Sequence, residues 1–379
     1  MTPKERIVAA FRGEKPDQVP VSPELWDVIP IRVSGRPFYE FGGTSFGKTP
    51  LWKAQLDAYR FFGCEAWIPV EPGLSERQKS MVTARSRFLS EDLIETELVY
   101  RTMWGELHEI KHSCFDYDLW SIDPPVNNLL ADLPKIAEYF FEDPSRLNYS
   151  AIAAAYEQTG DDGICEGTVG NTFFEFLTVF RRGGALQVIL DLHEHEDYLR
   201  EVQTHYIRYL VGIAEEICRR TPVEGLFLNC GSASLNITSP ELFRTWDLPL
   251  VRAVAEVARR HNRIFHYHLH GLGRRLLDDL VEAGITMICP LECLPKGDFI
   301  LREVKNSFGD RLALKGGVDP FVLREAGPDE IERIVQRCLE DAAEGGGYTL
   351  STGDGVLKDT PFENIRLLTS YTRKHGTYT

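Results

Sequence analysis

Residues 264–270 read IFHYHLH, a short run in which apolar residues and histidines alternate. The run is too short for a typical helix, and its composition is typical of a parallel strand buried on both faces of a sheet. Alternation along such a strand places His266, His268 and His270 on one face, with the later two at its C-terminal end. This stretch therefore predicts a buried strand that ends in a polar cluster.

Similar apolar runs occur on both sides of it, and each is followed by a segment with helical periodicity. They cover residues 163–169, 226–230, 286–292, 312–318 and 348–352. Parallel strands need crossover connections, so the pattern predicts a series of βα units. A further strand near Trp67, and an eighth that the sequence does not place, would close a (β/α)8 TIM barrel. A doubly wound sheet is the alternative, but no GxGxxG turn follows the first strand.

The N-terminal part is expected to extend this barrel. Thr2 and Glu5 form the capping-box pattern of a first helix, and a second helical pattern covers residues 48–62. Residues from about 85 to 115 alternate in places around Gly105, which predicts an inserted antiparallel β-hairpin. We therefore expect one barrel domain over residues 1–379, with 1–62 as an N-terminal arm with helices.

The composition excludes several classes of protein. The chain has 57 acidic and 42 basic residues, and the resulting charge of −15 disfavours nucleic-acid binding. Its 8 cysteines are scattered without a CxxC pair, so neither a disulfide framework nor a thiolate zinc knuckle is expected. The charged first residues and the lack of a long apolar run predict a cytoplasmic protein with no membrane span.

The histidines that end the run at 264–270 are candidate metal ligands. Site residues of parallel barrels lie at the C-terminal ends of the strands, and neutral imidazoles bind zinc and similar divalent metals well. We expect His268 and His270 to bind such a metal together with Asp354, which lies just past the last strand. Other candidates for the third ligand are Glu292, Cys289 and Cys293. The alternative is a hydrogen-bonded histidine layer, including the deeper His266, that binds substrate without metal.

Other strand ends carry candidate catalytic and substrate-binding groups. Glu166 would act as an acid or base, although a helix-side ion pair explains it equally well. Asn229 and Cys230 open a stretch of small residues to 234, which would either let a ligand approach or only link strand to helix. Gly316 and Gly317 lie where barrels often bind phosphate.

An ordered series of short motifs runs along nearly the whole chain. They are TPKER at 2–6, GEKPD at 13–17, WG at 104–105, SPELF at 239–243, HLHG at 268–271, GGVD at 316–319, GGGY at 345–348 and TPFENI at 360–365. In this order they resemble the uroporphyrinogen decarboxylase superfamily, which includes corrinoid-dependent methyltransferases with the same barrel. True decarboxylases of that superfamily carry an arginine-rich, RQAGRY-like segment near the N-terminus. This chain instead reads PELWDV at 23–28, followed by Arg32 and Arg36, so the resemblance favours the methyltransferase branch.

The resemblance also implies roles for the site residues. The methyltransferase branch has a His-x-Cys-Gly zinc motif and a later Cys, and His268, His270 and Asp354 stand at these three positions. The implied reaction moves a methyl group from a small methoxy- or methylamine-type substrate to a corrinoid, with Glu166 or Glu292 moving the proton. The chain lacks the Asp-x-His-x-x-Gly motif of corrinoid carriers, so the corrinoid is expected on a partner protein.

Two other functions remain open at this point. One is decarboxylation of a porphyrin-related or other carboxylated substrate, and the other is a barrel that binds a small ligand without chemistry. Either a monomer or a homodimer fits the sequence. Four aromatic residues would either cover the barrel mouth or pack the N-terminal arm: Trp26, Phe38, Tyr39 and Phe41.

Overall fold

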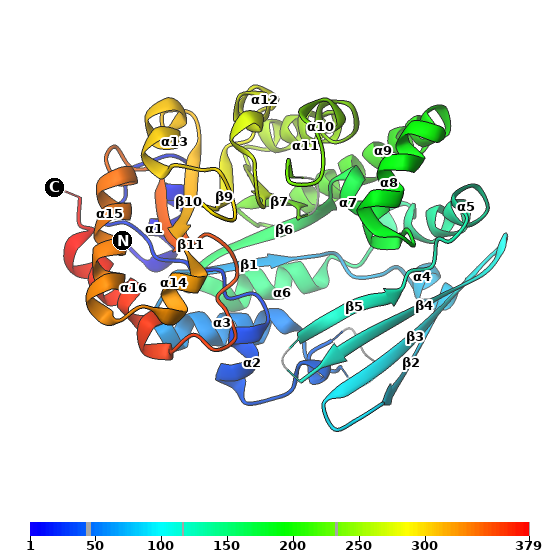
Figure 1. The fold of residues 1–379 in the computed structure, drawn as a ribbon, viewed down its shortest axis with the longest axis horizontal. Helices are drawn as coiled ribbons and strands as arrows, with labels where there is room; N and C mark the ends of the chain where they lie inside the picture. Colours follow the sequence, from blue (N-terminus) through cyan, green and yellow to red (C-terminus); the bar gives the residue numbers. More distant parts are fainter. Residues whose placement is uncertain (43–46, 116, 232–233, 379) are drawn as a thin grey trace.

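The computed structural model describes residues 1–42, 47–115, 117–231 and 234–378. Seven parallel strands form a curled sheet in the order β1-β6-β7-β8-β9-β10-β11 (Figure 1). They are β1 (Ala66–Val70), β6 (Gly163–Asn171), β7 (Gly225–Cys230), β8 (Ile264–Leu269), β9 (Met287–Leu291), β10 (Ala313–Val318) and β11 (Tyr348–Thr352). The strands expected from the apolar runs are confirmed, with ends that differ by two residues or fewer.

The eighth position of the barrel holds an irregular segment, residues 20–24, which we call the closing segment. Val21 forms a parallel bridge with Leu350 of β11, and the Ser22 amide donates to the Leu350 carbonyl at 2.9 Å. On its other side, the amide of Glu65, just before β1, donates to the Val21 carbonyl at 3.0 Å. The closing segment therefore lies between the first and last strands. The expected TIM barrel is confirmed, with an eighth member that is not a regular strand.

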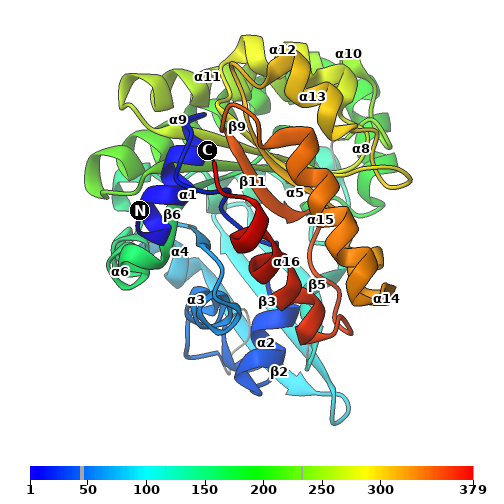
Figure 2. The ribbon, with the colours of Figure 1, turned by 90° about the vertical axis from the view of Figure 1, so that its left-hand side faces the viewer.

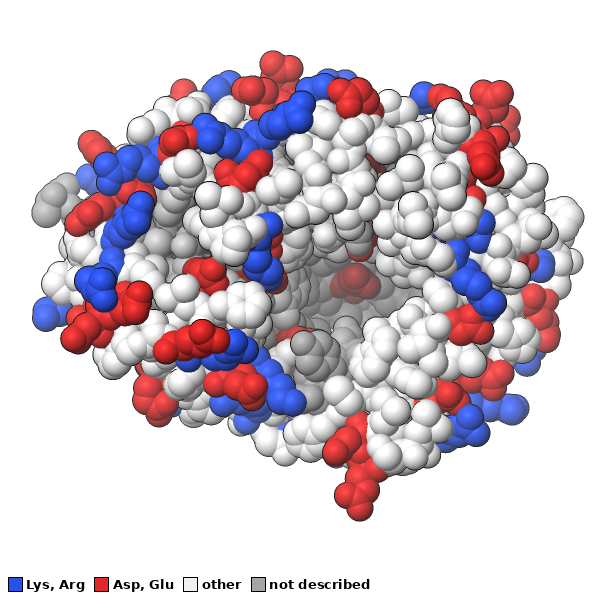
Figure 3. All heavy atoms as spheres, in the orientation of Figure 1, with Lys and Arg blue, Asp and Glu red and all other residues white. Residues whose placement is uncertain are grey.

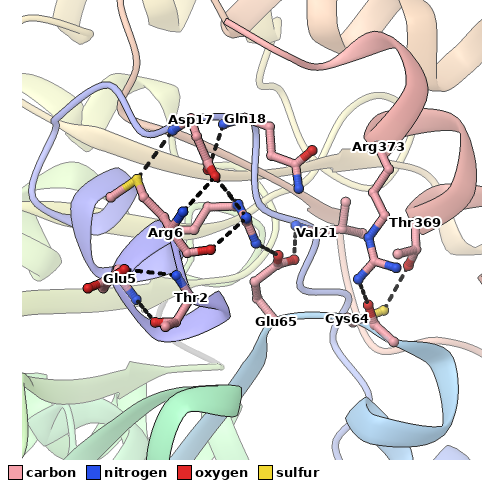
Figure 4. Close-up of polar contacts among 12 residues, drawn as sticks. Thr2, Glu5, Arg6, Asp17, Gln18, Val21, Cys64, Glu65, Thr369 and Arg373 are labelled. Carbon is pink, nitrogen blue, oxygen red and sulfur yellow. Dashed lines mark hydrogen bonds and ion pairs between the residues drawn. The ribbon is translucent and has the colours of Figure 1, made fainter.

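An ion-pair network fixes the closing segment to the N-terminal helix α1 (Pro3–Phe11) (Figure 4). Arg6 of α1 donates to Glu65 at 2.8 Å and to Asp17 at 2.7 Å. The second oxygen of Glu65 accepts the Val21 amide at 2.8 Å. Helix α1 itself begins at the expected capping box, in which Thr2 accepts the amide of Glu5 at 3.1 Å.

Helices surround the curled sheet, and both views place the two termini on the same side of the molecule (Figures 1 and 2). The N-terminal helices besides α1 are α2 (Val28–Ser34), the 3-10 turn η1 (Phe38–Glu40) and α3 (Leu51–Phe62). The helices before β6 are α4 (Glu76–Met81), α5 (Leu129–Phe140), η2 (Pro144–Arg146), α6 (Ser150–Thr159) and η3 (Gly160–Asp162). The later helices are α7 (Phe173–Phe180), α8 (Gly184–Glu194), α9 (Glu196–Arg220), α10 (Pro240–Trp246), α11 (Leu248–Arg260), η4 (Arg274–Leu276), α12 (Leu277–Ala283), α13 (Leu301–Phe308), α14 (Pro320–Glu325), α15 (Pro328–Ala342) and α16 (Phe362–His375). Among the described residues, no helix has both the length and the apolar character that crossing a bilayer requires.

A separate antiparallel sheet is inserted between α4 and α5, at the lower right of Figure 1. Its strands are β2 (Val82–Phe88), β3 (Leu93–Thr102), β4 (Gly105–Cys114) and β5 (Tyr117–Asp123), paired in that order. The expected hairpin at about 85–115 is confirmed as an insertion, with β3 and β4 meeting at Thr102 and Gly105. The sequence predicted two strands here, whereas the inserted sheet has four. Strand β2 was not predicted because none of its seven residues is buried, so its sequence lacks an alternating pattern.

The parallel arrangement brings the C-terminal ends of the barrel strands to one edge. Every residue of β8, β9 and β11 is buried, as expected for strands covered on both faces. The register places Asn229 of β7 beside His268 of β8, and His268 beside Cys289 of β9. Side chains from strands far apart in the sequence therefore meet at one end of the barrel.

Candidate metal and active site

The histidines of β8 form a column on the inner face of the barrel. His266 and His268 are 0% and 2% exposed, whereas His270, just after the strand, is partly exposed at the mouth. The ring of His268 lies within 5.5 Å of both Phe227 and Trp26, measured between ring centroids. The alternation that the sequence predicted is therefore present, and His270 is the member of the column nearest to solvent.

His270, Glu292 and Asp354 form what we call the outer group. The Nδ1 atom of His270 lies 2.9 Å from Glu292 Oε1 and 3.9 Å from Asp354 Oδ1. The other oxygen of Glu292 accepts the Gly271 amide at 2.6 Å, and the other oxygen of Asp354 contacts the Lys296 ammonium. One donor atom from each member lies within 4.8 Å of the others, so the group can hold a metal ion.

Glu24, His268 and Cys289 form a second set of donor atoms within 4.8 Å of one another, which we call the inner group. All three side chains are buried, and His268 Nδ1 lies 3.0 Å from Cys289 Sγ. Glu24 accepts the Trp26 indole N–H at 2.6 Å and contacts the ammonium of the fully buried Lys315. Lys315 thus already provides a positive charge beside the inner group.

The two groups meet at His268 and His270, whose Nε2 atoms lie 2.7 Å apart. Each imidazole is held at its Nδ1 atom, His268 by Cys289 and His270 by Glu292. Histidines that bind metals are commonly held in this way, with the second ring nitrogen hydrogen-bonded to a neighbour. The structure thus brings the predicted ligands His268 and His270 together and places Asp354 on the far side of His270.

The surroundings of these groups shift their pKa values in opposite directions. Burial, with the nearby His270 and His266, lowers the pKa of His268 well below its ordinary value. Burial also acts to lower the pKa of His270, but its hydrogen bond to the Glu292 carboxylate and the charge of Asp354 outweigh it and raise that pKa. His268 therefore offers a neutral imidazole, whereas a metal ion at His270 must compete with a proton.

The charges inside and at the mouth of the barrel do not balance. Four carboxylates and two ammonium groups contribute to this cluster: Glu24, Glu166, Glu292, Asp354, Lys296 and Lys315. One negative charge remains uncompensated when His270 carries the proton that its raised pKa favours, and two remain when it does not, which is costly for groups that are buried or partly buried. A divalent cation would offset them, so the charge of the site as well as its donor atoms fits a metal ion.

Glu166 lies away from the mouth. Its Oε2 atom accepts the Trp67 indole N–H at 2.7 Å and lies 2.7 Å from His266 Nδ1. His266 Nε2 in turn lies 2.8 Å from Cys289 Sγ. Of the two predicted acid–base residues, Glu292 is therefore part of the outer group, whereas Glu166 connects to it through His266, Cys289 and His268 in turn.

The predicted substrate-binding residues are not all on the inner side of the barrel. Asn229 lies level with His268, and its amide donates to Asn171 at 2.9 Å. The Cys230 thiol lies beside Tyr267 and Thr172, outside the histidine column. Ser232 and Ala233, also part of that predicted stretch, lie outside the described residues.

The two glycines of β10 serve close packing of the barrel. Gly316, with φ of +145°, passes so near β9 that a Cβ atom would lie 2.5 Å from the Leu291 nitrogen. At Gly317 a Cβ atom would lie 3.1 Å from the Cys338 sulfur of α15. The alternative ligand Cys293 joins neither ligand group, and its sulfur lies 4.0 Å from the Leu291 and Gly317 carbonyls.

Three residues of the cluster were missed by the sequence analysis: Glu24, Lys296 and Lys315. Glu24 and Lys315 are 291 positions apart, and they meet only because the closing segment lies in the barrel wall. Lys315 could have been recognised from its place in the middle of an apolar strand. A buried ammonium group needs an acidic partner, so this position predicts a nearby carboxylate.

A pocket of about 460 Å³ adjoins both ligand groups. Its lining includes Glu24, Trp26, Leu51, Gln55, Asp354 and Leu357. The Trp26 indole forms the wall between this pocket and His268. The space-filling view shows a hollow in this face of the molecule, between the barrel and the inserted sheet, with acidic atoms at its floor (Figure 3). Of the two interpretations of the aromatic residues, the position of Trp26 therefore agrees with the one that places them at the barrel mouth.

Comparisons with known proteins were made by sequence and by structure. Residues 191–375 match the family model described as uroporphyrinogen decarboxylase (URO-D). The chain is 30% identical over 178 residues to a uroporphyrinogen decarboxylase of Trichodesmium erythraeum, covering 46% of this chain and 45% of that protein. It is 27% identical over 135 residues to one of Coxiella burnetii, covering 35% of this chain and 36% of that protein. Each match thus spans less than half of the relative's length.

A solved structure of a methyltransferase from Methanosarcina mazei resembles the whole chain. The TM-score is 0.63 with 19% sequence identity, and the superposition covers 99% of both chains. At this level of identity the likeness establishes the common barrel fold.

Proposed function

We propose that the protein is a metal-dependent methyltransferase of the uroporphyrinogen decarboxylase superfamily, whose family model matches residues 191–375. It would move a methyl group from a small methoxy- or methylamine-type substrate to a corrinoid carried by a partner protein. The observation that carries this proposal is the facing pair of Nε2 atoms on His268 and His270, each imidazole held at Nδ1, with Asp354 on the Nδ1 side of His270.

The proposed ligands are His268, His270 and Asp354, with zinc or a similar divalent ion as the metal. A ligand set of two imidazoles and a carboxylate is typical of catalytic zinc sites, which keep one position open for substrate or water. When bound, the metal would act as a Lewis acid toward the heteroatom that carries the methyl group.

The chain's own residues would supply positioning and proton transfer. Glu292 is the carboxylate in contact with His270 and with the Gly271 amide at the mouth. We therefore assign to Glu292, rather than to Glu166, the relay of a proton from His270 to the heteroatom after it loses its methyl group, with His270 then reprotonated from water at the mouth. The apolar side chains of Trp26 and Leu51 would hold the substrate in the adjoining pocket and keep water out.

The proposed reaction also needs a partner protein that brings the corrinoid to the site. A methyl acceptor on a separate protein must reach the C-terminal ends of the strands, and the hollow of Figure 3 offers access to this face. The barrel shared with the Methanosarcina mazei methyltransferase supports the general kind of reaction, whereas substrate and partner are proposed from the site and from the sequence resemblance.

Decarboxylation is the second candidate, favoured by the names of the sequence relatives. A decarboxylase that acts on a porphyrin with many carboxylates needs cationic side chains that can form ion pairs with those carboxylates. The two arginines of the corresponding region already have partners, because Arg32 donates to the Thr360 carbonyl at 2.9 Å and Arg36 to Glu40 at 2.9 Å. This pairing makes porphyrin binding the less favoured function.

Metal binding is the first test of the proposal. The protein is stripped with a chelator, reloaded with zinc and analysed for metal, beside His268→Ala, His270→Ala and Asp354→Asn. His193→Ala, at an exposed histidine of α8, is the matched control. One zinc per chain in the wild type and the control, lost or much weakened in the three variants, is expected. No specific metal in the wild type would refute the proposal.

The reaction is tested on the loaded wild-type protein. Methoxylated and N-methylated compounds are offered with cob(I)alamin as the acceptor, and methylation is followed by the change in its absorbance. Uroporphyrinogen is offered separately, and release of carbon dioxide is measured. We expect methylation of the corrinoid with one donor class and no carbon dioxide. The reverse result would establish the decarboxylase.

A further inference from the structure

A continuous chain of buried polar contacts crosses the barrel interior and ends at the mouth. It runs from Glu166 to His266 at 2.7 Å, to Cys289 at 2.8 Å, to His268 at 3.0 Å and to His270 at 2.7 Å. Glu166, His266 and Cys289 are each 0% exposed. Groups so far from water must take their hydrogen-bond partners from one another, which restricts where each proton can lie.

The direction of the hydrogen bonds follows from the acceptor at the start of the chain. The Oε2 atom of Glu166 accepts the Trp67 indole N–H and lies 2.7 Å from His266 Nδ1, and because a carboxylate oxygen can only accept, this contact assigns the proton to His266 Nδ1. A neutral His266 with its proton on Nδ1 presents a lone pair at Nε2, toward Cys289. The thiol of Cys289 can then donate its single proton to His266, so its sulfur acts as an acceptor toward His268.

The same result follows if the thiol points elsewhere. Cys289 also lies beside Glu24, which could accept its proton instead. Whether the proton goes to His266 or to Glu24, the sulfur is left as the acceptor for His268 Nδ1.

We propose that Cys289 is a positioning residue that, supported by Glu166 and His266, holds His268 in the Nδ1–H tautomer and so presents its Nε2 lone pair at the mouth. A metal ion binds only an unprotonated ring nitrogen, and a partner on the other nitrogen selects which one is available. The bearing on methyl transfer rests on the proposed function, whereas the tautomer itself does not.

Long-range 1H–15N correlation spectra of histidine-labelled, metal-stripped protein report the tautomer directly. The His268 signals, identified by their loss in His268→Ala, should show the proton on Nδ1. Cys289→Ala should shift His268 toward the Nε2–H tautomer, and Cys289→Ser should retain the wild-type state because a hydroxyl both donates and accepts. Cys165→Ala removes another buried thiol, on β6, and is the matched control for loss of packing. A wild-type His268 with its proton on Nε2, or no change in Cys289→Ala, would overturn the proposal.

Metal affinity gives the second readout. Removing a partner that orients a ligand commonly weakens metal binding by about 10- to 100-fold, so Cys289→Ala should lose zinc affinity by about that factor while Cys289→Ser stays near the wild type. Cobalt(II) replaces zinc to test direct ligation. A sulfur-to-cobalt charge-transfer band in the wild type, lost in Cys289→Ala, would make Cys289 a ligand and overturn its positioning role. Failure of the wild type to bind metal, with the expected tautomer intact, would refute the proposed function alone.

Discussion

Asp247 joins helix α7 to the start of α11 from a fully buried position. Its Oδ1 atom accepts the Phe174 amide at 2.9 Å, in the first turn of α7. Burial raises the pKa of Asp247 to about 7, although the amides of Phe174 and Phe173 oppose the shift. Since α7 begins directly after β6, this carboxylate helps to place the end of a barrel strand.

The raised pKa predicts a pH dependence of stability with a definite sign. The folded state binds the Asp247 proton more tightly than the unfolded state, whose pKa is about 3.9. The contribution of Asp247 to the free energy of unfolding should therefore fall as the pH rises from about 4 to about 7, and stay constant above that. Urea unfolding of Asp247→Asn should lack this fall, and the two proteins should diverge by on the order of 4 kcal/mol across the window.

The comparison needs a carboxylate of ordinary exposure as its control. Asp310→Asn, at an exposed position between α13 and β10, should follow the wild type at every pH. Parallel pH profiles for the wild type and Asp247→Asn would show that Asp247 is not perturbed in the folded state.

The closing segment explains both the success and the limit of sequence prediction for this fold. The regular strands were predictable because each is a short apolar run buried on both faces. The closing segment was not predictable. Pro20 and Pro23 lack the amide protons that a strand ladder needs, so the sequence of this segment is typical of a loop. The contact of Glu24 with Lys315 was hidden with it, whereas His268 and His270 were predictable from their own strand.

The network around Arg6 predicts how strongly the closing segment is held. Arg6 and Glu65 are both largely buried, and Glu65 also binds the Val21 amide (Figure 4). Arg6→Met would leave the Glu65 carboxylate buried without its cation, which typically costs about 3 to 5 kcal/mol. Urea unfolding should show a loss of this order. Arg12→Met, at the exposed end of the same helix, should stay within about 0.5 kcal/mol of the wild type.

Asp17 adds an acid-sensitive part to this network. The hydrogen bond from Arg6 lowers the pKa of Asp17 to about 2, against the opposing effect of burial. Its stabilising contribution is therefore present above the unfolded pKa of about 3.9 and is lost as the pH falls toward about 2. Unfolding of Asp17→Asn should accordingly be less sensitive to acid than that of the wild type.

At the scale of the whole molecule, the barrel and the inserted sheet differ in how they are held. The barrel strands are buried on both faces, whereas β2 has no buried residue and β3 has three. The inserted sheet contacts the rest of the chain mainly through α4, α5 and the 3-10 turn η1. Such a unit has few buried apolar contacts of its own, and regions of this kind open at a lower free energy than a protein's core.

Hydrogen exchange in the native state should separate the two parts. Amides of β3 and β4 should exchange through an opening of lower free energy than amides of β7 and β8, which need global unfolding.

A substitution at Tyr100 makes this test more specific. The Tyr100 hydroxyl donates to the buried Glu109 carboxylate at 2.7 Å, and both residues lie within the inserted sheet. Tyr100→Phe leaves that oxygen without its donor and should lower the opening free energy of the sheet by about 2 kcal/mol. The protection of β7 and β8 should not change, because the barrel opens independently. An equal loss of protection in both parts would mean instead that the inserted sheet and the barrel unfold as one cooperative unit.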